Sequence, residues 1–406
     1  MEVCYPRCCG IDVHKETLVV CLRLHEGRRV HKEVQTFQTT TSEILRLRTW
    51  LTAQGCTHVA MESTGVYWRP VFNLLEDCLV VVLANAQHIK AVPGRKTDVR
   101  DCEWLAELLA HGLIRASFIP PADIRALRDL TRHRKSLLRD RVKATNRIHK
   151  LLETANIKLA TVLSDIVGVS GRAMLRALAD GDTDPDRLAA LARGSLVRKK
   201  AALTEALRGR FTSHHAFLLR QLLAQLDHFA TLIEACDQQI ASVAAPLQPH
   251  LERLQTIVGV GPRSAEVIVS EIGVDMARFA SSAHLASWAR ICPGTHESAG
   301  KRRSAGTGTG NNWLRTTLLE SAWAASHQRS SYLGARYRRL SKRRGPKRAA
   351  IAVAHTILVI AYHILRDETT FQDLGPDYFD RADAGRQKRY YLRRLEALGC
   401  DVSQVA

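Results

Sequence analysis

The pattern of apolar residues changes at Pro120-Pro121, and this change constrains the fold more than any other feature of the chain. Before the prolines, helix-like segments alternate with short apolar runs rich in β-branched residues, at Cys9 to Leu22, Thr57 to Met61 and Cys78 to Ala84. Such alternation indicates an α/β domain over residues 1–120. After the prolines the strand signals end, so the chain cannot have one uniform architecture.

Apolar residues after Pro121 recur at spacings of three and four, which indicates a long amphipathic helix. They are Leu127, Leu130, Leu137, Leu138, Val142, Ile148, Leu151 and Leu152. A second long helix is expected from His215 to Val243, and shorter helices and loops are expected between the two. We therefore predict a basic, all-helical region with a coiled-coil arm over residues 121–250.

The remaining residues divide into a mainly helical unit at 251–370 and a polar tail at 371–406. The longest apolar run, Ile351 to Leu365, is too short to span a bilayer, and no apolar targeting segment precedes Gly10. Ten cysteines without CxxC spacing predict reduced thiols, not a zinc site or a disulfide framework. We expect a cytoplasmic, nucleoid-associated bacterial protein with no membrane partner.

Positive charge is concentrated in two zones. The chain has 59 Lys and Arg against 40 Asp and Glu, a net charge of +19. Residues Arg125 to Lys150 contain ten Lys or Arg and two acids, and Lys301 to Arg348 contain thirteen and one. Because the two surpluses together exceed the net charge, the rest of the chain is near neutral. This distribution is typical of a protein that contacts a phosphate backbone. The alternative is a pair of solvated helix faces.

Four carboxylates in the α/β part are candidates for a metal site. Asp12 lies inside an apolar strand, Glu62 follows another, and Asp98 and Asp101 share one face at the start of an expected helix. Clustered carboxylates need a cation to stay ionised, and all-oxygen ligation suits Mg²⁺ or Mn²⁺. Such ions stabilise the attacking and leaving oxygens of a phosphodiester. The alternative is that Asp12 caps a turn and the other pair are ordinary acids of a helix N-terminus.

A glycine hairpin and a serine loop are the candidate features of the C-terminal unit. Gly259 and Gly261 lie in a segment that resembles a helix-hairpin-helix element, whose backbone N–H groups bind a phosphate. The alternative is a packing joint between two helices. Ser298 lies in a glycine-flanked loop beside three cations that could stabilise charge on an attacked phosphorus: Lys301, Arg302 and Arg303. Spacing alone does not single out Ser298, because other serines lie nearby.

Five segments together carry a family pattern. They read Gly-Ile-Asp-Val-His-Lys at 10–15, Met-Glu-Ser-Thr-Gly-Val-Tyr at 61–67, Gly-Arg-Lys-Thr-Asp-Val-Arg-Asp at 94–101, Thr-Ile-Val-Gly-Val-Gly at 256–261 and Gly-Asn-Asn-Trp-Leu-Arg at 310–315. In order and spacing they resemble the DEDD transposases of the IS110 family of bacterial insertion sequences. The resemblance leaves residues 155–215 and the tail poorly covered.

The resemblance implies a ribonuclease-H-like, RuvC-type fold for residues 1–120, with metal-binding acids at Asp12, Glu62, Asp98 and Asp101. It also implies a transposase domain in the C-terminal unit, whose serine forms a covalent phosphoserine link with DNA. The matching position is Ser298. The family pattern there usually reads Ser-Gly, whereas this chain has Ser298-Ala299-Gly300.

The resemblance further implies partners. Members of the family use a structured noncoding RNA, the bridge RNA, that pairs with donor and target DNA. The first basic zone would then suit RNA, with contacts at Arg132, Arg134, Arg139 and Arg141. The second would suit DNA near the serine, with contacts at Lys301, Arg302, Arg303, Arg343 and Arg344. A homo-oligomer is expected, a dimer at least and a tetramer at synapsis.

These features predict an enzyme, a transposase that cuts and rejoins insertion-sequence ends and target DNA through a Mg²⁺-assisted phosphoserine intermediate. One alternative is a RuvC-like two-metal nuclease in which water or a DNA 3′-hydroxyl attacks, and in which Ser298→Ala retains cleavage. A second alternative is a non-catalytic nucleic-acid-binding scaffold. In that case Asp12→Asn and Asp98→Asn change neither metal affinity nor any DNA product.

Overall fold

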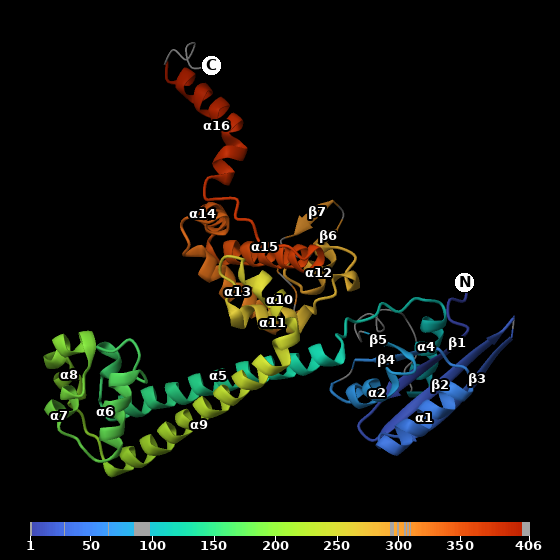
Figure 1. The fold of residues 1–406 in the computed structure, drawn as a ribbon, viewed down its shortest axis with the longest axis horizontal. Helices are drawn as coiled ribbons and strands as arrows, with labels where there is room; N and C mark the ends of the chain where they lie inside the picture. Colours follow the sequence, from blue (N-terminus) through green and yellow to red (C-terminus); the bar gives the residue numbers. More distant parts are fainter. Residues whose placement is uncertain are drawn as a thin grey trace. The chain divides into compact units, whose positions relative to one another are not determined.

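The chain folds into two compact units, Met1–Ile119 and Pro120–Ala406, which are described here one at a time (Figure 1). The computed structural model describes residues 2–27, 29–63, 65–84, 98–292, 296–298, 300–303, 306, 308 and 310–399. Within these ranges, the side chains of 98–100, 296–298, 301–303, 383, 386 and 387 lie outside the description.

The first unit is built on a five-stranded mixed sheet with strand order β3-β2-β1-β4-β5. The strands are β1 (Arg7–Val13), β2 (Thr17–Glu26), β3 (Arg29–Gln38), β4 (His58–Glu62) and β5 (Val80–Ala84). The first three form an antiparallel meander, and β4 and β5 run parallel to β1. This mixed sheet confirms the predicted α/β class of the N-terminal part.

Helices cover both faces of this sheet. On one face, Cys9 and Ile11 of β1 pack with α1 (Thr41–Ala53) and α2 (Trp68–Leu75) in one buried cluster. On the other face, Cys8 packs with Leu105 and Leu109 of α4 (Asp98–Ala110). Alternate residues of a strand point to opposite faces, so β1 divides its side chains between the two layers. The helix predicted from Asp98 is confirmed.

The second unit begins with two long antiparallel helices, α5 (Ala122–Thr154) and α9 (Ser213–Ala244), which lie side by side in Figure 1. Both were predicted from their apolar spacing. Between them in sequence, α6 (Val169–Ala179), α7 (Pro185–Ala190) and α8 (Lys200–Leu207) form a small cap, with 3₁₀ turns at Leu159–Thr161 and Gly194–Lys199. The cap shares one apolar core with α5 and α9, which includes Met174 of α6, Leu203 of α8 and Leu219 of α9.

The C-terminal part of this unit is a helical cluster. It contains α10 (Gln248–Gln255), α11 (Pro262–Ile272), α12 (Ser282–Trp288), α13 (Asn312–Ser326), α14 (Tyr332–Arg344), α15 (Pro346–Asp367) and α16 (Tyr378–Ala397), with 3₁₀ turns at Ala245–Leu247 and Met276–Arg278. The segment expected as a glycine-rich loop forms a short hairpin instead, β6 (His296–Ser298) and β7 (Lys301–Arg303). Residues predicted as a polar tail include α16. The predicted boundaries at 250 and 370 stay predictions.

Helix α15 is the core helix of this cluster. It packs against α10, α12, α13 and α14, and its buried residues include Val353, Ile357 and Leu358. In the described part of the chain it is also the one helix long and apolar enough to cross a membrane, although half of its apolar window is buried inside the protein. The helix exceeds the apolar run of the sequence because it begins at Pro346, five residues before that run.

Candidate active site and nucleic-acid interface

The strand register places two of the predicted acids next to each other. Strands β1 and β4 are parallel neighbours, and Ile11 is paired with Met61. The next residues along the two strands are Asp12 and Glu62, so the two carboxylates lie at the same end and on the same face of the sheet. The side chain of Asp12 is 16% exposed, and that of Glu62 is partly buried. This face is the one that α4 covers, because Cys8 and Ala60 pack against it.

Gly10 allows α4 to approach β1 closely. A Cβ atom at Gly10 would lie 2.1 Å from the backbone oxygen of Cys102 and 2.5 Å from the backbone nitrogen of Ala106. Two residues earlier in the strand, the thiol of Cys8 is hydrogen-bonded to the backbone oxygen of Ala106 at 3.4 Å. Only glycine permits this separation between strand and helix.

The same contacts give the direction of the helix. The strand runs from Cys8 towards Asp12, while its contacts on α4 move from Ala106 back to Cys102. Two strand residues advance about 6.6 Å and four helical residues about 6 Å. Asp12 is therefore level with the first turn of α4, where Asp98 and Asp101 lie. The backbone brings all four predicted acidic positions to one end of one face of the sheet.

The chemistry of this oxygen donor set fits a hard divalent cation. Asp101 is partly buried, and the side chain of Asp98 lies outside the described residues. Among the side chains that are described, no three His, Cys, Asp or Glu residues form a group that could hold a metal ion. Metal binding at these four positions stays a prediction.

His14 is a neighbour of the acidic cluster that the sequence analysis missed. Its Nε2 atom lies 3.2 Å from Oδ2 of Asp12, and its side chain is 43% exposed. The available signal was the spacing, since residues two apart in an extended segment share a face. A histidine at this distance can restrict the orientation of the Asp12 carboxylate by an electrostatic contact.

The predicted nucleophile lies in the β6-β7 hairpin. The backbone register pairs Ser298 with Lys301, Glu297 with Arg302 and His296 with Arg303. Gly300 occupies the turn with a φ of +73°, a conformation that favours glycine. The side chains of Ser298, Lys301, Arg302 and Arg303 lie outside the described residues, so their predicted roles stay predictions.

The glycine hairpin joins α10 to α11 as expected, and its two glycines have different environments. Gly259 has a φ of +89°, and a Cβ atom there would lie 2.3 Å from the backbone oxygen of Ser321 on α13. This close approach is the packing role that we weighed as the alternative. Gly261 precedes the first turn of α11, and no atom lies within 4 Å of its Cβ position. Phosphate binding at either glycine stays a prediction.

Two of the four arginines predicted to bind RNA have partners inside the protein. Arg132 donates two hydrogen bonds of 2.7 Å to Glu271, a residue of α11 that is 0% exposed. Arg134 pairs with Asp237 of α9 at 2.5 Å. These ion pairs connect α5 to its neighbours, so both arginines have structural roles that their position in a basic run does not reveal.

The network around Glu271 also includes Asn311, which belongs to the family pattern at 310–315. Asn311 donates to the Glu271 carboxylate at 2.6 Å, and its side-chain oxygen accepts from the first backbone N–H groups of α13. Arg128 donates at 2.8 Å to the backbone oxygen of Glu271. The Gly-Asn-Asn-Trp-Leu-Arg segment at 310–315 therefore connects α13 to α11 and α5.

The other two arginines predicted to bind RNA, Arg139 and Arg141, are exposed. The guanidinium carbon of Arg139 lies 4.5 Å from the ring centroid of Trp313, which orders the side chain by a cation–π contact. Arg141 lies on the exposed surface. Arg139 also lines a cavity of about 410 Å³ between α5, α11 and α13. Burial raises the pKa of Glu266 in this cavity, although Arg263 beside it opposes the shift.

Exposed basic residues of the second zone lie at the end of α14 and at the start of α15, where Lys347 and Arg348 are exposed. Six of the thirteen residues of α14 are Lys or Arg, and Arg343 and Arg344 lie exposed in its last turn. Cations at a helix C-terminus are favoured by the helix dipole, which explains why this turn tolerates three of them in a row.

A mixed sheet that places Asp12 beside Glu62, followed by a helical unit with exposed Lys and Arg residues, is compatible with an enzyme that acts on DNA. Residues 9–157 match a family model of DEDD transposases of the IS110 type, and residues 251–338 match the model of the transposase IS116/IS110/IS902 family. The chain belongs to the IS110 family of transposases.

Individual relatives agree with these matches. The chain is similar to y4pF/y4sB of Sinorhizobium fredii, named as a transposase, with 26% identity over 68% of this chain and 64% of the relative. It is also similar to the transposase for insertion sequence element IS1328 of Yersinia enterocolitica, with 24% identity over 77% of this chain and 82% of the relative. The chain thus spans just under two thirds of the Sinorhizobium protein.

Proposed function

We propose that this chain is a DNA transposase that cuts and rejoins insertion-sequence ends and target DNA. The proposal rests on one observation. Asp12 and Glu62 lie at the same end of one face of the sheet as the first turn of α4. The family membership and the names of the relatives support it. We further propose that the sheet has the ribonuclease-H-like, RuvC-type architecture.

The acidic cluster is proposed as the metal site. Asp12, Glu62, Asp98 and Asp101 would hold Mg²⁺, or Mn²⁺ as a substitute, through oxygen atoms alone. A bound divalent cation would polarise the scissile phosphate and stabilise the departing 3′ oxygen. His14 would hold the Asp12 carboxylate in its orientation through the contact at 3.2 Å.

Ser298 is proposed as the nucleophile. Its Oγ atom gives up its proton and forms a bond to phosphorus, while the bond from phosphorus to the 3′ oxygen breaks. The 3′ oxygen takes up one proton as it leaves, so the exchange neither consumes nor releases protons overall. The phosphoserine bond keeps the energy of the broken phosphodiester, so a DNA hydroxyl can rejoin the strand by the reverse exchange without ATP. The pairing of Ser298 with Lys301 in the hairpin supports this role, because it keeps the serine within a run of cations.

Both basic surfaces are proposed to bind nucleic acid. On α5 the direct contacts to a bridge RNA would come from Arg139 and Arg141, since Arg132 and Arg134 pair with buried or partly buried acids. On α14, Arg343 and Arg344 would contact DNA. We propose a homo-oligomer assembled through a coiled coil formed by the α5-α9 arm, a dimer that becomes a tetramer at synapsis, acting in the cytoplasm at the nucleoid.

The test is a cleavage assay with the element's end DNA, its flanking transcript and Mg²⁺. Asp12→Asn removes one negative charge and one metal ligand while it keeps the side-chain shape. We expect the rate of DNA cleavage to fall at least 100-fold, because removal of one group that stabilises charge in a transition state has an effect of about this size. Binding of the DNA should be retained. Asp77→Asn is the matched control, an exposed acid of the same unit outside the cluster, and it should cleave normally.

The outcome also separates the alternatives. Cleavage that survives Asp12→Asn would refute the proposed role of the acids in the reaction. DNA binding without any cleavage by the parent protein would leave the non-catalytic scaffold. A second candidate, the two-metal nuclease, is favoured by the fact that all four acids belong to a single unit of the chain. That candidate requires Ser298→Ala to cleave as well as the parent protein.

A further inference from the structure

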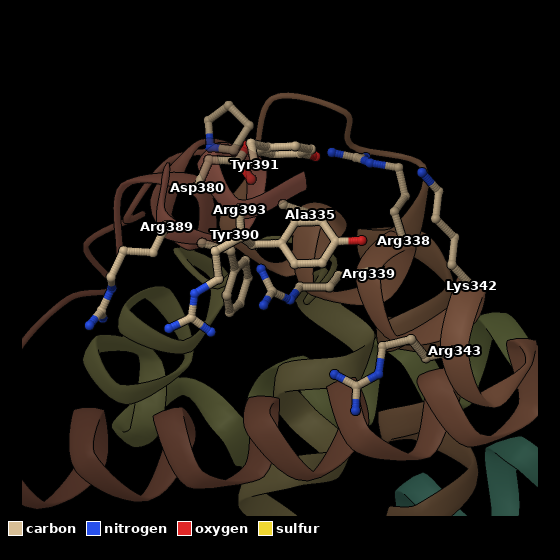
Figure 2. A pocket seen from close by; sticks show the side chains of 12 residues that line it. Ala335, Arg338, Arg339, Lys342, Arg343, Asp380, Arg389, Tyr390, Tyr391 and Arg393 are labelled. Atoms are coloured by element: carbon tan, nitrogen blue, oxygen red, sulfur yellow. The ribbon is translucent and has the colours of Figure 1, made fainter. Parts of the chain in front are cut away.

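A basic groove between α14 and α16 extends the α14 surface proposed to contact DNA, because it shares Arg343 with that surface and adds residues of α16. Six cations line it, with Asp380 as the one acid among its described lining residues: Arg338, Arg339, Lys342, Arg343, Arg389 and Arg393. The cavity measures about 1050 Å³. Figure 2 shows Arg338 and Lys342 on one side of it and Arg389 on the other. A hollow with this excess of positive charge suits a polyanion.

Two exposed tyrosine rings lie among these cations. Tyr390 and Tyr391 are 54% and 59% exposed, and their ring centroids are 5.4 Å apart with an angle of 71° between the planes. Arg394 donates a hydrogen bond of 2.8 Å to the Tyr390 hydroxyl, which fixes that ring in place. Ordered rings with open faces can stack on planar ligands.

Phe379, which lines the groove, stacks against residues of α14. Phe379 lies against Tyr332 with ring centroids 5.3 Å apart and planes 19° from parallel. The guanidinium carbon of Arg339 lies 5.3 Å from the Phe379 centroid. These contacts connect the start of α16 to α14, so the cations of one helix and the tyrosines of the other are held as one surface.

We propose that this groove binds single-stranded DNA, with phosphates on the cations and unpaired bases stacked on Tyr390 and Tyr391. Bases of a duplex already cover one another's faces, so stacking on protein rings selects unpaired strands. The choice of DNA rests on the proposed function, in which strands are cut and exchanged. The basic and aromatic groove itself does not depend on the acidic cluster or on Ser298.

The test measures fluorescence anisotropy of labelled oligo-dT of about 20 nucleotides, oligo-rU of the same length and a blunt DNA duplex, all with the full chain. Tyr390→Ala with Tyr391→Ala should weaken oligo-dT binding by about 5-fold to 100-fold and leave duplex binding within 2-fold, a range of about 0.4 kcal/mol. The matched variant with both tyrosines changed to Phe keeps the rings and should bind oligo-dT as the parent does. Both tyrosines are exposed, so thermal unfolding should not change in either variant.

Charge is tested separately. Arg389→Ala with Arg393→Ala removes two cations of the groove and should lower the slope of log affinity against log salt by about 1.4 for single strands. Arg198→Ala with Lys200→Ala removes the same charge from exposed positions of the cap and should leave the slope unchanged. An equal loss in both double variants would overturn the assignment.

Three other results would contradict the proposal. Unchanged oligo-dT binding after both tyrosines become Ala would remove the stacking role, and an equal loss on the duplex would make the surface a general phosphate contact. Tighter, tyrosine-dependent binding of oligo-rU than of oligo-dT would assign the groove to RNA. In each case Asp12→Asn still reports on cleavage, so failure of the groove and failure of the proposed function are distinguishable.

Discussion

Loss of the Glu271 carboxylate should destabilise the second unit more than loss of any exposed acid. Glu271 is 0% exposed and accepts two hydrogen bonds from Arg132 and one from Asn311, with Arg128 at 3.4 Å. Glu271→Ala leaves the partly buried Arg132 without its carboxylate acceptor and removes the negative charge beside Arg128. Breaking a buried ion pair from one side costs ~3–5 kcal/mol, because the remaining charge stays desolvated.

The assay is thermal and urea unfolding of the full chain. A loss of ~3–5 kcal/mol should lower the Tm of the second unit by about 6 °C or more. Glu320→Ala is the matched control, because Glu320 pairs with Lys135 at 3.2 Å but is 61% exposed, and such pairs contribute at most about 1 kcal/mol. Adding Arg132→Ala to Glu271→Ala should cost less than the sum of the single variants, since both act on one contact. If Glu271→Ala unfolds like the control, the network does not join α5 to α11.

Two further predictions concern backbone packing and thiol chemistry. Gly259→Ala should destabilise the chain by about 2 kcal/mol or more in urea unfolding, because its φ is +89° and a Cβ atom would contact backbone at 2.3 Å, whereas Gly261→Ala has open space and should change stability little. Equal effects of the two would contradict the packing role. In reaction with a thiol reagent, the exposed Cys4 and Cys78 should be labelled first, whereas burial raises the pKa of Cys8 to about 12 and should protect it until unfolding. Fast labelling of Cys8 in the folded chain would refute this.

The sequence predicted best the elements whose signal is local and repeated. The long helices α5 and α9 were expected from their apolar spacing, and both are present, because apolar residues recur along them at intervals of three and four. The sequence predicted that Asp12 and Glu62 lie near each other, but not that they are neighbours on adjacent strands. That placement required knowing that β1 and β4 are parallel neighbours, and the approach of α4 required the contact at Gly10.

Elements without an apolar face were missed. Strand β3 is exposed along most of its length, so its sequence does not alternate between apolar and polar residues. Its extended conformation comes from backbone pairing with β2. Helix α16 is polar all round, so the region containing it was predicted as a tail. Neither element buries enough of its own surface to leave a periodic signal.

The partners of the basic helix were missed for another reason. Arg132 and Glu271 are separated by 139 positions, so no spacing rule connects them. A run of cations predicts a charged surface but does not say which members point inward. The one local clue was Glu271 itself, an acid in the last turn of the apolar helix α11, since a buried acid requires a partner.

The most direct test of the account is recovery of protein–DNA adducts after incubation with the element's end DNA, its flanking transcript and Mg²⁺. The attached residue is located by peptide mass spectrometry. The account predicts an adduct at Ser298 that disappears in Asp12→Asn and persists in Asp77→Asn. Cleaved DNA without any adduct would contradict the phosphoserine intermediate, and an adduct that forms normally in Asp12→Asn would contradict the role of the acidic cluster.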